Sequence, residues 1–146
     1  MRRDNRGYSL IELIVVIALL GILVGIVTSS LAPLLSARAR RAAFSADSLI
    51  AKCKVFSMSR TGDVYVRIYR DARGVVGDYY EGANLVETEI LGSRGVVIAP
   101  DSATVSFNRA TGGLKPGSDA EISFSAGART YTVTIITSTG RHGVTS

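Results

Sequence analysis

The sequence predicts an α+β fold, in which one long N-terminal helix packs on a small antiparallel β-sheet head. Two changes of pattern along the chain carry this prediction. Residues 10–32 form an apolar run, interrupted by Glu12 and Thr28–Ser30, and a helical spacing of apolar residues continues it to about residue 59. After Gly62 the apolar residues alternate with polar ones, which is the spacing of half-buried strands. The 146 residues leave room for a single compact head.

The apolar run is long enough to cross a membrane. As a helix, residues 10–32 reach roughly 34 Å, against a hydrocarbon core of about 30 Å. A cleaved secretory signal peptide is the alternative, but its apolar core is shorter and Glu12 interrupts the start of this one. We therefore expect residues 8–32 to form a transmembrane helix. Arginines flank it on both sides, so the positive-inside rule does not fix its orientation.

The second half of the helix is amphipathic. Over residues 33–59, apolar side chains recur at spacings of three and four, which places them on one face. This face consists of Leu35, Ala39, Ala42, Ala46, Leu49, Cys53 and Phe56. Thr61–Gly62 then favours the end of the helix. We expect this face to cover the apolar side of the sheet.

The sheet is predicted within residues 63–146, which complete a globular head of residues 33–146. Turn signals such as "DARG", "GSRG", "ATGG" and "KPGSD" separate short strands, and short strands joined by tight turns indicate an antiparallel sheet. The expected strands are residues 64–69, 75–80, 85–91, 96–99, 104–108, 121–125 and 130–137.

The residue inventory argues against catalysis. The chain has one cysteine and one histidine, which excludes both an intrachain disulfide and a zinc site of Cys and His ligands. Cys53 lies on the apolar face of the helix without a base nearby in sequence, so we interpret it as a buried hydrophobic residue. His142, near the C-terminus, is expected to be mobile or hydrogen-bonded. We expect no enzyme activity, no catalytic residue, no cofactor and no metal.

The stretch "RGYSLIELIVVIALLGIL" resembles the N-terminal segment of type IV pilins and type II secretion pseudopilins. The resemblance implies that prepilin peptidase removes a cytoplasmic leader, residues 1–7, by cutting between Gly7 and Tyr8. The new N-terminus at Tyr8 is then methylated, and Glu12 becomes the fifth residue of the mature chain. The family usually has Phe where this chain has Tyr8, which puts the efficiency of methylation in doubt.

The resemblance also implies a role for Glu12. For an arbitrary protein, a glutamate in the first turns of a helix is tolerated at low cost, because it meets the positive end of the helix dipole. In pilin assemblies the corresponding glutamate pairs with the N-terminal amine of a neighbouring subunit. In a dry bundle of helices such a pair fixes the axial register, because an unpaired carboxylate is costly there.

The C-terminal part resembles the minor pilins and pseudopilins grouped as GspH/FimT-like. The similarity rests on Phe107, Gly112–Gly113 and Thr139–Gly140–Arg141 within "TVSFNRATGGL" and "STGRHG". It is less specific than the N-terminal one, because Gly-rich hairpins are common. The C-terminal disulfide loop of many pilins is missing.

These resemblances imply a structural subunit, a minor pilin or pseudopilin, of a type IV pilus or a type II secretion pseudopilus. Before assembly it would be a single-pass protein of the cytoplasmic (inner) membrane with its head outside, and afterwards part of an extracellular or periplasmic filament. The implied partners are other pilin subunits, prepilin peptidase and an assembly platform protein.

The alternative is a DNA-binding minor pilin of a competence pilus, since the chain has a formal charge of +5. Basic side chains and tyrosines for base stacking are present in the head. They are Arg67, Arg70, Arg73, Arg94, Arg109, Lys115, Arg129 and Arg141, with Tyr65, Tyr69, Tyr79 and Tyr80. Acidic neighbours such as Asp71 and Asp78 favour an ordinary solvated surface instead, so nucleic acid is not the preferred partner.

Overall fold

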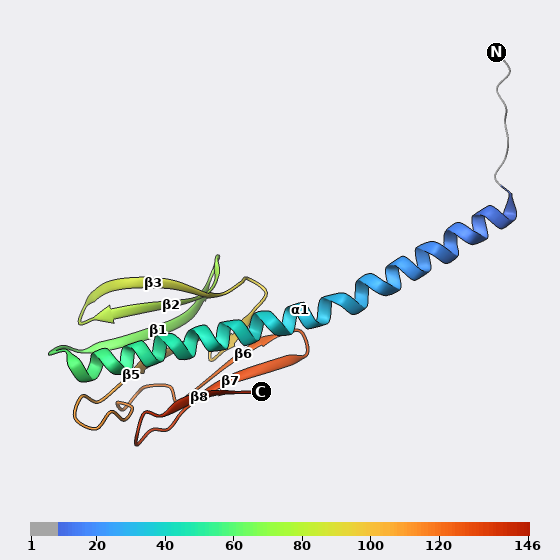
Figure 1. Cartoon of the computed structure of the whole chain (residues 1–146). Coiled ribbons are helices and arrows are strands. Elements are labelled where there is room, and N and C mark those ends of the chain that lie inside the picture. Colours follow the sequence, from blue (N-terminus) through green and yellow to red (C-terminus); the bar gives the residue numbers. More distant parts are fainter. Residues whose placement is uncertain (1–8) are drawn as a thin grey trace, which may run out of the picture. The chain divides into compact units, whose positions relative to one another are not determined.

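The computed structural model describes residues 9–146, except for the side chains of residues 26–32. One helix, α1, runs from Leu10 to Ser59, with Pro33 inside it. The chain forms two compact units, of which the first ends at Pro33 and the second comprises Leu34–Ser146. The second unit contains the second half of α1 and all the strands (Figure 1). The predicted α+β class, with a long N-terminal helix and antiparallel strands, is confirmed.

The strands form two four-stranded antiparallel sheets rather than the single sheet that we predicted. The first has the order β3-β2-β1-β5 and the second the order β4-β6-β7-β8. The strands of the first sheet are β1 (Val64–Asp71), β2 (Gly74–Glu81), β3 (Asn84–Gly92) and β5 (Ser102–Ser106). Those of the second are β4 (Val97–Ala99), β6 (Glu121–Ala126), β7 (Arg129–Ile135) and β8 (His142–Thr145).

The first sheet combines local and distant pairing. β1, β2 and β3 follow one another as hairpins, and Tyr65 faces Tyr80 across the first of them. The chain then enters the second sheet through β4 and returns to place β5 on the other side of β1, where Tyr65 faces Ser106. The alternation of apolar residues could not reveal that the chain passes from one sheet to the other, because the strands of both sheets repeat every two residues.

The strand β8 was not predicted. Of its four residues, Val144 alone is a large apolar one, and glycines lie on either side of His142, so the segment lacks an alternating pattern. It forms because Val144 pairs with Val133 of β7 and packs against the core. His142 therefore lies in a strand rather than in a mobile tail. Its Nδ1 is 3.1 Å from the Gly140 carbonyl oxygen.

The predicted apolar face of the helix is confirmed as the centre of the core. Ala39, Ala42 and Ala46 are fully buried, and Leu49 and Cys53 are buried with them, while Leu35 and Phe56 pack at the margins. The buried face is wider than predicted, because it also includes Ala43, Ile50 and Ser57. One continuous cluster of apolar side chains joins this face to both sheets.

Small residues let α1 approach the first sheet closely. A Cβ on Gly92 would lie 2.9 Å from the Cβ of Ala42, and a Cβ on Gly77 would lie 2.4 Å from Cδ2 of Leu49. One heptad further along, the ring of Phe56 lies 5.8 Å from that of Tyr79. Successive heptad positions of α1 thus contact the first sheet at Gly92 of β3 and at Gly77 and Tyr79 of β2, and the helix runs alongside this sheet (Figure 1).

Candidate functional site

The start of α1 brings together the residues on which the resemblance depends. Leu10 is the first helical residue, and the amide of Leu13 donates to the carbonyl oxygen of Ser9 at 3.2 Å. Glu12 therefore lies in the first turn, as predicted, and its side chain is exposed. An anion at this position interacts favourably with the positive end of the helix dipole, by about 0.3–1 kcal/mol.

The sequence reasoning missed the contribution of Ser9. Ser9 directly precedes the first helical residue and Glu12 follows three positions later, so "SLIE" has the spacing of a capping box. This spacing of Ser and Glu was the signal that could have located the helix start. From this spacing we expect Glu12 to have a local role at the helix start in addition to the one that the resemblance implies.

The cleavage site itself, Gly7 and Tyr8, lies outside the described residues, as does the rest of the 1–7 leader. Cleavage between these residues and methylation of Tyr8 therefore remain predictions. The distance between Glu12 and the amine that cleavage would create is likewise outside the described part of the chain.

The helix surface beyond Glu12 is apolar on every side and uncovered. From Leu10 to Val24, the large apolar side chains are 47–76% exposed. A surface helix of an ordinary globular protein has a polar face, whereas a helix that is apolar all round is stable only when something surrounds it. Within the described residues no other element packs against this segment. The segment is therefore a candidate surface for assembly.

We expected residues 8–32 to cross a membrane. In the part of the chain that the structure describes, no helix combines the length and the apolar character that a crossing requires.

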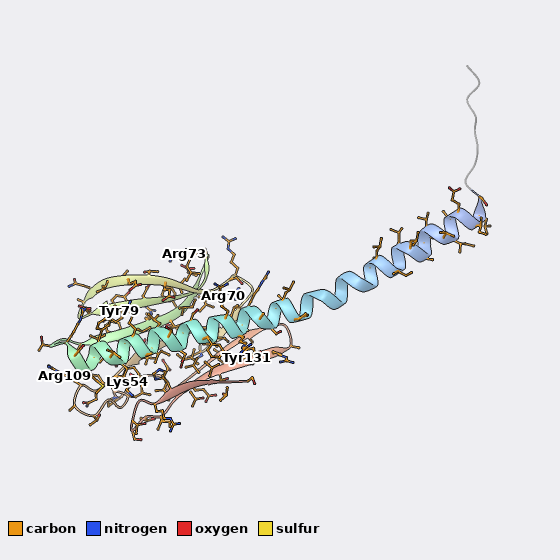
Figure 2. All side chains as sticks on the ribbon, viewed as in Figure 1. Lys54, Arg70, Arg73, Tyr79, Arg109 and Tyr131 are labelled. Carbon is orange, nitrogen blue, oxygen red and sulfur yellow. The ribbon has the colours of Figure 1, made fainter. Side chains whose placement is uncertain are left out.

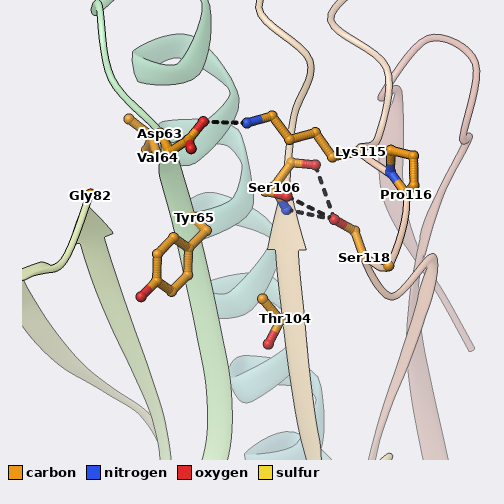
Figure 3. Close-up of a pocket in the computed structure, with 10 residues that line it drawn as sticks. Asp63, Val64, Tyr65, Gly82, Thr104, Ser106, Lys115, Pro116 and Ser118 are labelled. Carbon is orange, nitrogen blue, oxygen red and sulfur yellow. Dashed lines mark hydrogen bonds and ion pairs between the residues drawn. The ribbon is translucent and has the colours of Figure 1, made fainter.

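A hollow lies beside the β5 edge of the first sheet (Figure 3). It has a volume of about 440 Å³ and lies between β1, β5 and the loop of residues 115–118. The loop covers the free edge of β5, because Lys115 N donates to the Ser106 carbonyl oxygen at 2.9 Å and Thr104 N donates to Asp119 Oδ2 at 2.7 Å. An edge strand that is covered in this way cannot pair with another chain.

The polar groups that line this hollow are an ion pair and hydroxyl groups. Lys115 Nζ lies 2.5 Å from Asp63 Oδ1, and the pKa of Asp63 is lowered by this hydrogen bond. Ser106 Oγ and Ser118 Oγ are 3.0 Å apart. The residues lining the hollow include no histidine or cysteine, so the hydroxyls have no base beside them. Among the described residues no group of three or more potential ligands could hold a metal ion.

The residues of the DNA-binding alternative do not form one surface. Tyr79 is buried, and burial raises its pKa to about 12. The Tyr69 hydroxyl donates to Asp78 Oδ2 at 3.0 Å, and this hydrogen bond raises the Tyr69 pKa. Tyr65 and Tyr80 stack on each other, with ring centroids 4.7 Å apart. Of the four tyrosine rings, one is buried, one is fixed by a hydrogen bond to a carboxylate and two stack on each other.

The two glycine-containing segments of the C-terminal resemblance lie against each other. A Cβ on Gly140 would be 2.1 Å from the Gly112 carbonyl oxygen and 2.9 Å from the Phe107 ring. The amide of Leu114 donates to the Thr137 carbonyl oxygen at 2.8 Å, and Lys54 Nζ of α1 donates to the Thr139 carbonyl oxygen at 2.9 Å. The motif residues thus form a contact between two turns and the end of α1.

The comparisons with known proteins bear on the first segment of the chain. Residues 2–28 match the model of the prokaryotic N-terminal methylation motif, a range that includes Gly7, Tyr8 and Glu12. No curated protein and no solved structure matches the chain. The match agrees with the position of Glu12 in the first helical turn, before an uncovered apolar surface. Residues 2–28 therefore carry the signal of a type IV pilin-like or pseudopilin precursor.

Proposed function

We propose that the chain is a structural subunit, a minor pilin or pseudopilin, of a type IV pilus or type II secretion pseudopilus. The observation that supports this most directly is the uncovered apolar surface of α1, which lies on both sides of Glu12 and overlaps the matched methylation motif. Before assembly the subunit is anchored in the cytoplasmic membrane by this segment. After assembly the same surface packs against the helices of neighbouring subunits.

Glu12 determines the axial position at which a subunit joins the filament. After cleavage the amine of Tyr8 lies four residues before Glu12 in the same chain, and in the filament Glu12 pairs with the Tyr8 amine of a neighbour. A carboxylate surrounded by apolar helices and left unpaired is strongly destabilising, whereas a paired one is tolerated. A subunit that enters at the wrong height is therefore rejected.

The partners in this proposal are other pilin subunits, prepilin peptidase and an assembly platform protein. The chain itself carries no catalytic role and no cofactor. The GspH/FimT-like subtype is supported by the contact between Gly112–Gly113 and Thr139–Gly140. The glycines of the motif share one role there, because their lack of a side chain lets the two turns pack closely.

The test is the variant Glu12→Gln, which removes the charge and keeps the side-chain shape. In cells that produce the filament, we expect normal removal of residues 1–7, seen by intact mass, but at least tenfold less variant chain co-purifying with filaments. Glu89→Gln, an exposed glutamate of β3, is the matched control and is expected to co-purify like the native chain. Native-level co-purification of Glu12→Gln would contradict the pairing, and an uncleaved native chain would contradict the proposed function as a whole.

A further inference from the structure

Arginines from three parts of the head lie at one end of it, near the point where the head's part of α1 begins. Figure 2 shows Arg70 and Arg73 at this end, with Arg109 and Lys54 at the opposite end. We call the group the basal arginine patch. It consists of Arg38, Arg40 and Arg41 of α1, Arg70, Arg73 and Arg94 of the first sheet and its loops, and Arg129 of the β6–β7 hairpin.

Three sets of contacts bring these arginines near one another. Arg38, Arg41 and Arg73 line one hollow of about 690 Å³ beside β3, together with one carboxylate, that of Glu89. Arg70 Nη2 donates to the Arg94 carbonyl oxygen at 3.2 Å. On the other side of α1, Arg40 and Arg129 line a second hollow. The topology thus joins arginines that are up to 91 positions apart in the sequence.

Most of these charges have no carboxylate partner. Within the described residues, the patch has one ion pair, between Arg73 Nη2 and Asp71 Oδ2 at 2.8 Å. Arg40 lies over the ring of Phe44 instead. Elsewhere in the described part of the head three cations are paired, Lys52 with Glu87, Arg60 with Glu81 and Lys115 with Asp63. Lys54 and Arg67 donate to uncharged oxygens instead, so what distinguishes the patch is the number of arginines at one end of the head. Several like charges held close together repel one another, and an external anion relieves that repulsion.

We propose that the basal arginine patch binds the phosphates of anionic lipid headgroups and holds the head against the membrane surface before assembly. This inference rests on the proposed membrane-anchored stage. Leu34 is 57% exposed and precedes Arg38 by four residues, which is about 6 Å of helix. The polar headgroup zone is about 5–7 Å deep on each side of a bilayer. If the apolar segment is held in lipid, Arg38 therefore lies at headgroup level.

The surroundings of the patch favour lipid over nucleic acid. Single-stranded nucleic acid binds where bases stack on exposed aromatic rings between cations. The stacked pair Tyr65 and Tyr80 lies toward the far end of the first sheet, beside Ser106, whereas Arg70 and Arg73 are at the near end. Tyr131, beside Arg129, is 9% exposed, whereas Phe44 is 50% exposed with Arg40 Cζ 5.5 Å from its ring centroid. The patch thus offers several guanidinium groups for phosphate and one half-exposed ring, which already has a guanidinium beside it.

The test uses the full chain in lipid nanodiscs made of phosphatidylcholine alone or of phosphatidylcholine with phosphatidylglycerol. We expect hydrogen exchange at the amides of residues 71–74 and 92–95 to slow several-fold with phosphatidylglycerol, and added salt to reverse the effect. The triple variant Arg38→Gln, Arg41→Gln, Arg73→Gln should lose the dependence on phosphatidylglycerol. The control Arg60→Gln, Arg109→Gln, Arg141→Gln changes the same charge elsewhere in the head and should keep it. Exchange in β6 and β7 checks that both variants are folded.

The outcomes separate this inference from the proposed function. A chain that enters the nanodiscs but exchanges equally in both lipid mixtures overturns the inference and leaves the proposed function intact. A chain that does not enter either nanodisc overturns both. Equal protection in phosphatidylcholine nanodiscs by inorganic phosphate or by a DNA oligonucleotide overturns the assignment to lipid, in favour of a general phosphate site or of nucleic acid.

Discussion

Cys53 lies with its thiol between α1 and β5, where Sγ is 4.0 Å from Ser57 Oγ and 3.8 Å from the Val105 carbonyl oxygen. The residue is fully buried, and burial raises the pKa of the thiol from 9.0 to about 11, because the thiolate would lose its hydration. The hydrogen bond with Ser57 opposes this shift but is the smaller effect. At neutral pH the thiol is therefore protonated and unreactive, as expected of a residue that packs in a core.

This shift predicts a loss of stability at alkaline pH. The folded state holds the thiol proton more tightly than the unfolded state, so stability is constant below about pH 9 and falls as the pH rises toward 11. Two pKa units correspond to a loss of up to about 3 kcal/mol. Urea unfolding between pH 7 and about pH 9.5 measures the onset of this loss. Tyr79, whose pKa is raised from 10.0 to about 12, adds its own loss of stability as the pH passes 10. Cys53→Ala should be less stable at pH 7 but should show a flatter dependence, and an unchanged slope in Cys53→Ala would refute the assignment.

Among the structural elements, the contact between the 107–114 and 136–141 turns depends on backbones that approach closely. Gly140 has φ of +61°, a conformation that L side chains rarely adopt, and its Cβ position is occupied by the Gly112 carbonyl oxygen. Gly113 is confined similarly, because a Cβ there would lie 2.7 Å from the carbonyl oxygens of Thr137 and Ser138. Backbone atoms cannot move aside as the end of a side chain can.

We therefore expect Gly140→Ala to destabilise the protein by about 2–4 kcal/mol, from the strained φ together with the collision. Gly143→Ala is the matched control, because nothing lies within 4 Å of its Cβ position and it is only three residues away. Chemical unfolding of both variants of the full chain in detergent measures the difference. Equal stability of the two variants would show that the turns separate without cost.

The helix and strands could be predicted from the sequence where they depend on the local pattern of residues alone. The helix end at Ser59 and the seven strands from β1 to β7 followed from period and turn residues, with small shifts such as residues 104–108 against Ser102–Ser106 for β5. The division into two sheets could not be predicted, because it depends on pairs such as Tyr65 with Ser106 that are distant in sequence. At the candidate site, Glu12 was predicted from its motif. The basal arginine patch was not, because topology rather than spacing brings Arg38 beside Arg73.

At the scale of the whole molecule, the apolar core and the exposed apolar segment from Leu10 to Val24 are separate. Every residue of the apolar core belongs to Leu34–Ser146, with Leu35 the first of them. None of the exposed apolar side chains between Leu10 and Val24 contributes to it. Removing the first unit should therefore leave the packing of the head unchanged.

We accordingly expect a chain that begins at Leu34 to fold without detergent and to melt cooperatively within a few degrees of the head in the full chain. Circular dichroism gives the melting temperature, and sedimentation gives the state of association. The truncated chain should be a monomer, whereas the full chain should require detergent or lipid. A truncated chain that lacks a cooperative transition would show that residues before Leu34 help to stabilise the head.

The contacts that α1 makes at Ala42, Leu49 and Phe56 also determine how mechanical tension enters the head. Because the helix runs along the first sheet and contacts it at these heptad positions, a pull along the helix axis loads these contacts together, in shear. A helix attached at one end would instead separate one contact at a time. The long buried face of α1 therefore distributes tension along the head, which is what the proposed role in a filament would demand.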